Sequence, residues 1–149
     1  MMVSGLGHFD GKTHILPLRV YYEDTDLSGM VYHANYLRYM ERARTEFFRL
    51  AGVTKMADLD SDEPTAWAIR DVRARYHRPA RVDDALTVRT RLAAISGARI
   101  EAVQKIYAGG ILLVEGRIEA CIVTLTGKPR RLPAALRDLL TPFLVETDT

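Results

Sequence analysis

The feature that most constrains the fold is one long helical repeat of apolar residues between positions 35 and 51. These residues follow one another at steps of 4, 3, 4 and 3 positions, and they are Tyr36, Met40, Ala43, Phe47 and Leu50. This period places them along one face of an α-helix about 25 Å long. Asn35 is suited to the N-cap of that helix, and Gly52 to the position just after its C-cap. A helix with one apolar face must pack that face against other elements, so the rest of the chain has to cover it.

Most of the remaining sequence has the alternation or the β-branched composition of strands. One strand is expected before the helix and four after it, at residues 15–23, 65–76, 86–92, 100–106 and 111–124. The alternation changes phase at Arg70 and Asp71, which predicts a β-bulge. Gly109 and Gly110 predict a hairpin turn. A short helix is expected at residues 133–144.

This order of elements predicts an α+β domain over residues 15–149, preceded by an N-terminal tail of residues 1–14. Its sheet would have five antiparallel strands, the last four in a meander, wrapped around the long central helix. An open sheet leaves edge strands that need cover. Pairing across a two-fold axis covers such an edge, so a homodimer or homotetramer is expected.

Composition and charge exclude several classes of function. The 149 residues include 21 basic and 19 acidic ones, a net charge of +2 that argues against a nucleic-acid-binding protein. No apolar run approaches the roughly 20 residues that span a bilayer, and residues 1–14 lack the apolar segment of a signal peptide. The only cysteine, Cys121, cannot form an internal disulfide. A cytoplasmic protein without an integral membrane segment is therefore expected.

Residue spacing gives no support to metal or cofactor chemistry. The four histidines, His8, His14, His33 and His77, do not have the spacing of metal ligands. The glycines near the N-terminus do not open a phosphate-binding βα unit, and no Gly-x-Ser-x-Gly motif of a serine hydrolase occurs. We therefore expect neither a metal site nor a cofactor.

Polar residues gather instead in the loop just before the predicted helix. This loop contains Asp24, Asp26, Gly29 and His33. A helix N-terminus presents unpaired N–H groups and about half a positive charge, which can stabilise an oxyanion. A carboxylate beside it can attack a carbonyl carbon or activate water. The same residues could also simply cap turns, so the loop by itself leaves both interpretations open.

A longer pattern extends from this loop through the helix and beyond it. Its positions are Tyr22, Thr25, Asp26, Gly29, Val31, Tyr32, His33 and Tyr36, then residues 41–44, then Arg78, Pro79, Ala80, Asp83, Asp84 and Leu86, and finally residues 127–131. This pattern resembles the signature of the 4-hydroxybenzoyl-CoA thioesterase family, most closely its branch of Tol–Pal-associated acyl-CoA thioesterases. The resemblance covers residues 17–140 and implies a hotdog fold and hydrolysis of acyl-CoA thioesters.

The resemblance also implies roles for residues of the loop. Asp26 would be the nucleophile or the general base, and the backbone N–H of His33 would lie at the oxyanion site. Tyr22 and the imidazole of His33 would belong to the active site as well. Met30 stands where the family more often has valine or isoleucine, which would change the acyl pocket.

Substrate length suggests that a partner chain completes the site. An acyl-CoA is too long to be held by a single domain whose centre is filled by a helix. We therefore expect residues 76–80 and 96–99 of one chain to face Asp26 and His33 of the other. The expected substrate-binding residues are Gly29, Val31, Tyr32, Tyr76, Arg78, Pro79, Ser96, Gly97 and Arg99.

Two other functions stay open at this point. One is a hotdog hydratase or dehydratase, although those enzymes pair Asp and His four residues apart, whereas Asp26 and His33 are seven apart. The other is a non-catalytic acyl-CoA-binding protein, or a partner protein of envelope or lipid synthesis. The acyl group, the choice between dimer and tetramer and any link to the Tol–Pal system are not determined by the sequence.

Overall fold

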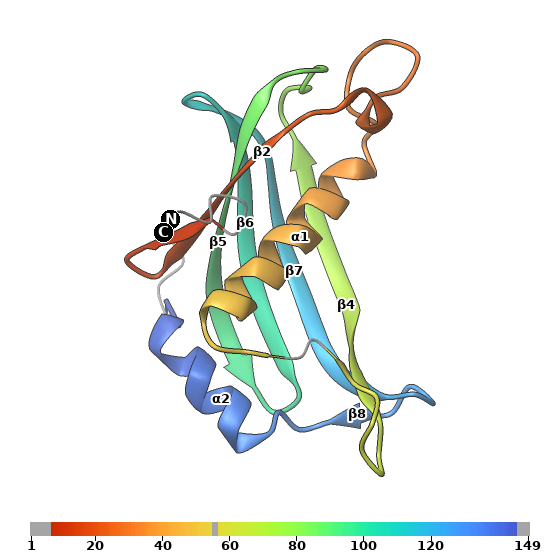
Figure 1. Ribbon diagram of the computed structural model, residues 1–149, viewed down its shortest axis with the longest axis vertical. Coiled ribbons are helices and arrows are strands. Elements are labelled where there is room, and N and C mark those ends of the chain that lie inside the picture. Colours follow the sequence, from red (N-terminus) through yellow and green to blue (C-terminus); the bar gives the residue numbers. More distant parts are fainter. Residues whose placement is uncertain (1–6, 55–56, 146–149) are drawn as a thin grey trace.

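The long helix lies at the centre of the fold, across one face of a curved antiparallel sheet (Figure 1). The computed structural model describes residues 7–54 and 57–145. The helix, α1, runs from Asn35 to Leu50. Four of the five apolar residues of the predicted stripe are buried, but Leu50 is 41% exposed, because it lies in the last turn, beyond the sheet-facing part of the stripe. The periodicity therefore predicted the helix and most of its buried face.

The ends of α1 differ by one residue from those expected. Ala34 is the N-cap, and Asn35 is the first residue inside the helix, so the prediction of Asn35 as N-cap is wrong. Its side chain points back to Asp24 and donates a hydrogen bond to that carboxylate. At the other end, Gly52 follows the C-cap and has a φ of 108°, a backbone conformation that glycine adopts without strain. The predicted role of Gly52 is confirmed.

The sheet contains the five expected strands and three short ones. The long strands are β2 (Thr13–Arg19), β4 (Thr65–Tyr76), β5 (Ala85–Ser96), β6 (Arg99–Ala108) and β7 (Ile111–Thr124). The short ones are β1 (His8–Asp10), β3 (Ala57–Asp58) and β8 (Pro129–Arg130). The expected count of five strands is therefore wrong, because two- and three-residue strands are too short to give an alternating pattern. A 3-10 turn, η2 (Tyr22–Asp24), follows β2, and the chain ends in α2 (Ala134–Leu140) and the 3-10 turn η3 (Thr141–Phe143).

The strand order differs from the expected meander. The order is β1-β2-β5-β6-β7-β4-β3, with β8 on β7, so β5, β6 and β7 form successive hairpins while β4 pairs with β7. The predicted turn at Gly109 and Gly110 and the predicted bulge near Arg70 are confirmed. Alternation identifies strands but does not choose their partners. After β4, the backbone N–H groups of His77 and Arg78 both donate to the carbonyl of Leu113, so the contact with β7 continues beyond the strand.

Residues 8–14, which the sequence analysis assigned to a tail, belong to the sheet. β1 forms a hairpin with β2, and His14 is completely buried. The ring of Phe9 lies 5.0 Å from that of Phe47 in α1 and 4.5 Å from that of Phe143 in η3. The domain therefore begins before residue 15, and of the expected tail only residues 1–6 lie outside the described residues.

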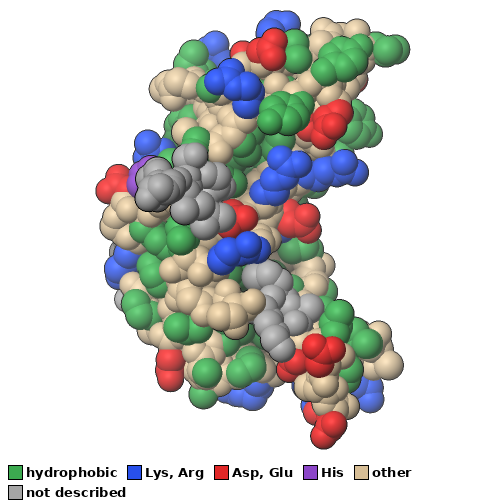
Figure 2. All heavy atoms as spheres, viewed as in Figure 1, with side chains coloured by type: hydrophobic (Ala, Val, Ile, Leu, Met, Phe, Trp, Pro, Cys, Tyr) green, Lys and Arg blue, Asp and Glu red, His purple; other side chains and the backbone are tan. Residues whose placement is uncertain are grey.

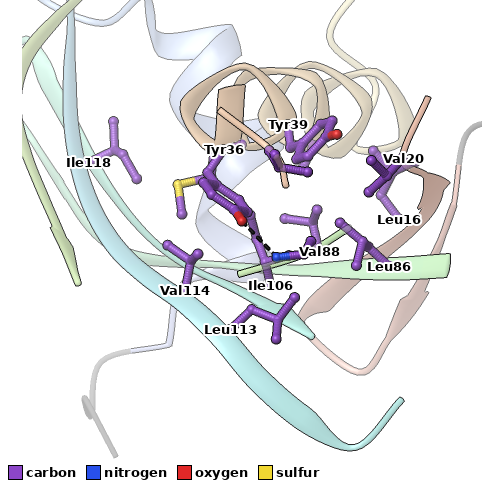
Figure 3. Packing of buried hydrophobic residues seen from close by; sticks show 14 residues of the cluster. Leu16, Val20, Tyr36, Tyr39, Leu86, Val88, Ile106, Leu113, Val114 and Ile118 are labelled. Carbon is purple, nitrogen blue, oxygen red and sulfur yellow. Dashed lines mark hydrogen bonds between the residues drawn. The ribbon is translucent and has the colours of Figure 1, made fainter. Parts of the chain in front are cut away.

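The core lies between α1 and the sheet. Figure 3 shows Tyr36 and Tyr39 of α1 pointing into a cluster of aliphatic residues from the sheet, among them Leu86, Val88, Ile106, Leu113 and Val114. A Cβ atom at Gly116 would lie 3.0 Å from the side chain of Met40, so glycine lets the helix approach β7 closely. No helix among the described residues combines the length and the hydrophobicity needed to cross a membrane.

Candidate active site

The loop between η2 and α1 is a tight turn built around Asp26. The backbone N–H of Asp26 donates to the carbonyl of Met30 at 2.9 Å, and that of Gly29 donates to the carbonyl of Asp26 at 3.1 Å. Gly29 has a φ of 80°, which a residue with a side chain rarely adopts. Figure 1 shows this loop (orange) at the N-terminal end of α1. The sequence therefore places Asp26 at the tip of a loop whose end leads directly into the helix.

The chain that connects β4 to β5 fixes this loop from one side. Val31 donates its backbone N–H to the carbonyl of Ala80 at 2.9 Å, and Ala80 donates its own N–H to the hydroxyl of Tyr36 at 2.9 Å. The hydroxyl of Tyr76 donates to the carbonyl of His33 at 3.1 Å. Residues 76–80 thus contact the loop within one chain. The expected contact of these residues with the site of a partner chain stays a prediction.

The carboxylate of Asp26 is exposed and held by Ser28. Its Oδ1 atom accepts hydrogen bonds from the hydroxyl and, at 2.8 Å, from the backbone N–H of Ser28. The side-chain bond first, and the backbone bond second, hold the pKa of Asp26 below its ordinary value of 3.8. Asp26 is therefore ionised at neutral pH, as a nucleophile or general base must be.

Replacing Ser28 by alanine tests this electrostatic state. The change removes the hydroxyl donor, which is the largest cause of the lowered pKa. The pKa of Asp26 should then rise toward its ordinary value. If Asp26 is the nucleophile or general base, it acts in its ionised form, so the acidic limb of the rate profile should move to higher pH. The rate of the variant between pH 6 and 8 should stay nearly equal to that of the unchanged protein. Turnover measured from pH 3 to 8 checks this, and an unmoved acidic limb would contradict a role for Asp26 ionisation.

His33 combines an exposed ring with an unpaired backbone donor. Its ring lies 4.5 Å from that of Tyr32. Within residues 7–54 and 57–145, no acceptor forms a hydrogen bond with the backbone N–H of His33. An unpaired N–H at a helix N-terminus can stabilise a developing negative charge. Figure 2 shows hydrophobic side chains at this end of the molecule, where Tyr22 is 82% exposed and Tyr32 is 51% exposed.

The other expected binding residues divide into two groups. Arg78 and Pro79 are exposed beside the loop. Ser96, Gly97 and Arg99 lie at the turn between β5 and β6, at the opposite end of the sheet from the loop (Figure 1). The 12 residues of β5 separate them from it by about 40 Å. Within a single chain, Ser96, Gly97 and Arg99 therefore do not reach Asp26. The carbonyl of Gly97 accepts hydrogen bonds from Leu132 and Arg137, so it anchors the C-terminal segment.

Some residues that shape the site were not identified from the sequence. Ser28 was not identified, although an aspartate in a loop often accepts the backbone N–H of the residue two positions later and so forms an Asx turn. Tyr36 was placed in the apolar stripe of the helix and in the family pattern, but no pattern predicted that its hydroxyl accepts the buried N–H of Ala80. Asp24 and Asn35 were taken as separate caps, but their side chains pair at 2.9 Å. No local pattern predicts that last contact, because it joins residues 11 positions apart.

A helix wrapped by an antiparallel sheet, with an ionised carboxylate beside the helix N-terminus, defines a hotdog-fold protein with a hydrolase-like site. Comparison with known proteins gives the family: the chain belongs to the thioesterase-like superfamily, whose profile matches residues 20–140. The thioesterase family and enzyme class expected from the sequence are thereby confirmed.

Individual relatives agree with this assignment. The chain is similar to the acyl-CoA thioester hydrolase YbgC of Escherichia coli O6:H1, with 39% identity over 122 residues, which are 80% of this chain and 90% of the relative. It is 35% identical to the acyl-CoA thioesterase YbgC of Haemophilus influenzae, over 81% of this chain and 89% of that protein. The crystal structure of a probable thioesterase from Bartonella henselae is similar, with a TM-score of 0.76 and 40% identity, covering 81% of this chain and 98% of the other.

Proposed function

We propose that this chain hydrolyses acyl-CoA thioesters to a free acid and coenzyme A. The observation that carries the proposal is an ionised, exposed carboxylate, Asp26, in a loop that ends at the unpaired N–H of His33. The curated relatives named as acyl-CoA thioester hydrolases cover four fifths of the chain and support the choice of substrate. Exposed apolar side chains around Asp26, including Tyr22 and Leu27, offer a surface for the acyl and pantetheine groups.

Two routes use these groups. As a general base, Asp26 takes a proton from water while the water oxygen adds to the thioester carbon. The resulting oxyanion accepts the His33 N–H, the C–S bond breaks, and the thiolate of coenzyme A recovers the proton. As a nucleophile, Asp26 first forms a mixed anhydride and expels the thiolate, and water then cleaves the anhydride. Both routes use the carboxylate of Asp26, the backbone N–H of His33 and one water molecule, and neither uses a cofactor.

Release of free thiol from a panel of short, long and aromatic acyl-CoAs tests the proposal directly. Turnover with at least one of them is expected. A hydratase or dehydratase would change the acyl chain without releasing thiol. A non-catalytic binding protein, or a partner protein of envelope or lipid synthesis, would bind acyl-CoA without turnover. Thiol release therefore separates hydrolysis from both alternatives, and a changed acyl chain in the recovered acyl-CoA separates a hydratase or dehydratase from a binding protein.

His33→Ala separates the two roles of that residue. If the imidazole orients water or the thioester, kcat should fall by roughly tenfold to a hundredfold. We expect this result, because the ring is exposed beside the loop and lies 4.5 Å from the ring of Tyr32. If only the backbone N–H acts, the variant should keep its catalytic efficiency. Tyr107→Ala, which changes an aromatic residue of β6, serves as the control and should retain kcat.

The edge of the sheet supports a homodimer or homotetramer. β4 pairs with β7 along its length but meets β3 only at its first residues, among the residues that the structure describes. A groove of about 260 Å³ separates this strand from α1, and the outline of the molecule is hollowed on the same side (Figure 2). The groove is lined by Leu37, Arg38, Glu41, Arg44, Ile69, Val72 and Ile118. Antiparallel pairing of two β4 strands would cover the exposed apolar side chains of Ile69 and Val72.

Such pairing also gives residues 96–99 a place in the site. Two antiparallel β4 strands put the distal end of one chain beside the Asp26 loop of the other. A preparation mixed from Asp26→Asn and Arg99→Ala chains should then regain part of the activity that each variant has lost, because one of its two shared sites is intact. Thiol release by purified mixed oligomers checks this. Mixed oligomers without regained activity would mean that each chain binds its substrate alone.

The cytoplasmic location stays a prediction. It follows from the sequence argument about the single cysteine, and fractionation of cells would test it. The sequence does not determine whether the protein is linked to the Tol–Pal system, and co-purification from cells would test for such a link.

A further inference from the structure

Asp24 is a buried carboxylate beside an exposed loop. It is 8% exposed, whereas Asp26, two residues later, is exposed. Its Oδ2 atom accepts the backbone N–H of Tyr21 at 2.8 Å, and its Oδ1 atom accepts the side-chain amide of Asn35 at 2.9 Å. Burying a carboxylate is costly unless its oxygens are hydrogen-bonded. These two donors therefore stabilise the carboxylate in its buried position.

The same two residues also bond to the backbone of Tyr32. The N–H of Tyr32 donates to the carbonyl of Asp24 at 3.0 Å, and the carbonyl of Tyr32 accepts the N–H of Asn35 at 2.8 Å. Since Asn35 also binds the carboxylate of Asp24, the three residues form a closed triangle of hydrogen bonds. Tyr32 is fixed at both of its backbone polar groups.

This triangle determines the direction of the proposed oxyanion donor. The carbonyl of Tyr32 and the N–H of His33 belong to one peptide group, and no described peptide bond is cis. In a trans peptide these two groups point in opposite directions. Because the Tyr32 carbonyl points toward the start of α1, the His33 N–H points away from it. The bond from Asn35 also polarises this peptide group, which strengthens its free N–H as a donor.

We infer that Asp24 and Asn35 act as a positioning pair, which orients and strengthens the His33 N–H as the oxyanion donor. The inference rests on the proposed thioester hydrolysis. A simple capping role does not explain the geometry, since Asn35 is the first residue of the helix and makes no side-chain cap. Its amide is directed to Asp24 instead. The pair joins the two ends of the loop that carries Asp26, so it acts through another group and does not touch the substrate.

The first test is kinetic. Asn35→Ala and Asp24→Asn should each lower kcat by about tenfold or more, because a small displacement of an oxyanion donor is costly in rate. KM should change by less than about threefold, since ground-state binding does not depend on this donor. Thr90→Val is the matched control. It removes a buried side-chain acceptor of Gln104, and it should lower the melting temperature without changing kcat.

A reciprocal exchange makes the test specific. Asn35→Asp alone places two carboxylates against each other and should be the most damaging single change. Combining it with Asp24→Asn restores one amide and one carboxylate with their roles exchanged. The double variant should therefore recover at least about threefold in kcat over Asn35→Asp, measured below the melting temperature of both proteins. A merely structural pair would recover thermal stability but not kcat.

The outcomes separate this inference from the proposed function. If Asn35→Ala and Asp24→Asn melt earlier, like Thr90→Val, but keep the kcat of the unchanged protein, the positioning role is wrong and thioester hydrolysis stands. If the unchanged protein releases no thiol from any acyl-CoA, the proposed function itself fails. A fall in kcat with recovery in the exchanged pair supports the inference.

Discussion

Asp26→Asn is expected to lower kcat by about a hundredfold or more, with the fold intact. The amide has nearly the same shape as the carboxylate, and its Oδ1 can still accept both hydrogen bonds from Ser28. It can neither remove a proton from water nor attack a thioester. Because the side chain is exposed and the amide can keep its hydrogen bonds to Ser28, the change should leave stability nearly constant. Thiol release and thermal melting of the purified variant check both parts.

Two further variants serve as controls. Asp10→Asn removes another exposed carboxylate, on β1 at the other side of the sheet from β4, and should keep full activity. Asp24→Asn changes the neighbouring carboxylate and should lose less activity than Asp26→Asn, because Asp24 is bonded inside the loop and does not reach the substrate. Equal losses in Asp24→Asn and Asp26→Asn would show that the reacting carboxylate has been wrongly assigned.

Phe47→Ala is expected to have the largest effect on stability, a loss of about 3–5 kcal/mol in the free energy of unfolding. Phe47 is 1% exposed, and its ring lies 5.0 Å from Phe9, 5.9 Å from Phe48 and 5.6 Å from Phe143. It therefore joins the β1–β2 hairpin, α1 and η3, which come from three distant parts of the chain. Truncation leaves a cavity where these elements meet. Urea unfolding followed by circular dichroism measures the loss.

Leu50→Ala is the control on the same helix. Leu50 belongs to the same apolar repeat but is exposed, so its truncation should change stability by no more than about 0.5 kcal/mol. Phe9→Ala should also be clearly destabilising, although the sequence analysis placed Phe9 in a tail. If Phe9→Ala changes the free energy of unfolding as little as Leu50→Ala does, residues 8–14 do not contribute to the stability of the domain.

The sequence determined those properties that depend on near neighbours along the chain. The helical repeat predicted α1, alternation predicted the five long strands and the bulge near Arg70, and the glycine pair predicted the hairpin at Gly109. The order of residues around Asp26 gave the family, because so many fixed positions recur in one order. Each of these features is local, since it is set by which side chains follow one another within a few residues.

Only the tertiary structure decided which distant segments meet. It placed β4 beside β7, brought Phe9 to Phe47, and set residues 76–80 against the Asp26 loop in the same chain. It also paired Asp24 with Asn35, although each residue alone has the character of a turn or cap residue. Periodicity cannot predict such contacts, because it reports which face of an element is buried and not what that face is buried against. Strand partners and the bonds of a polar side chain are chosen by the packing of the whole domain, in which a buried polar group must find a partner wherever the fold supplies one.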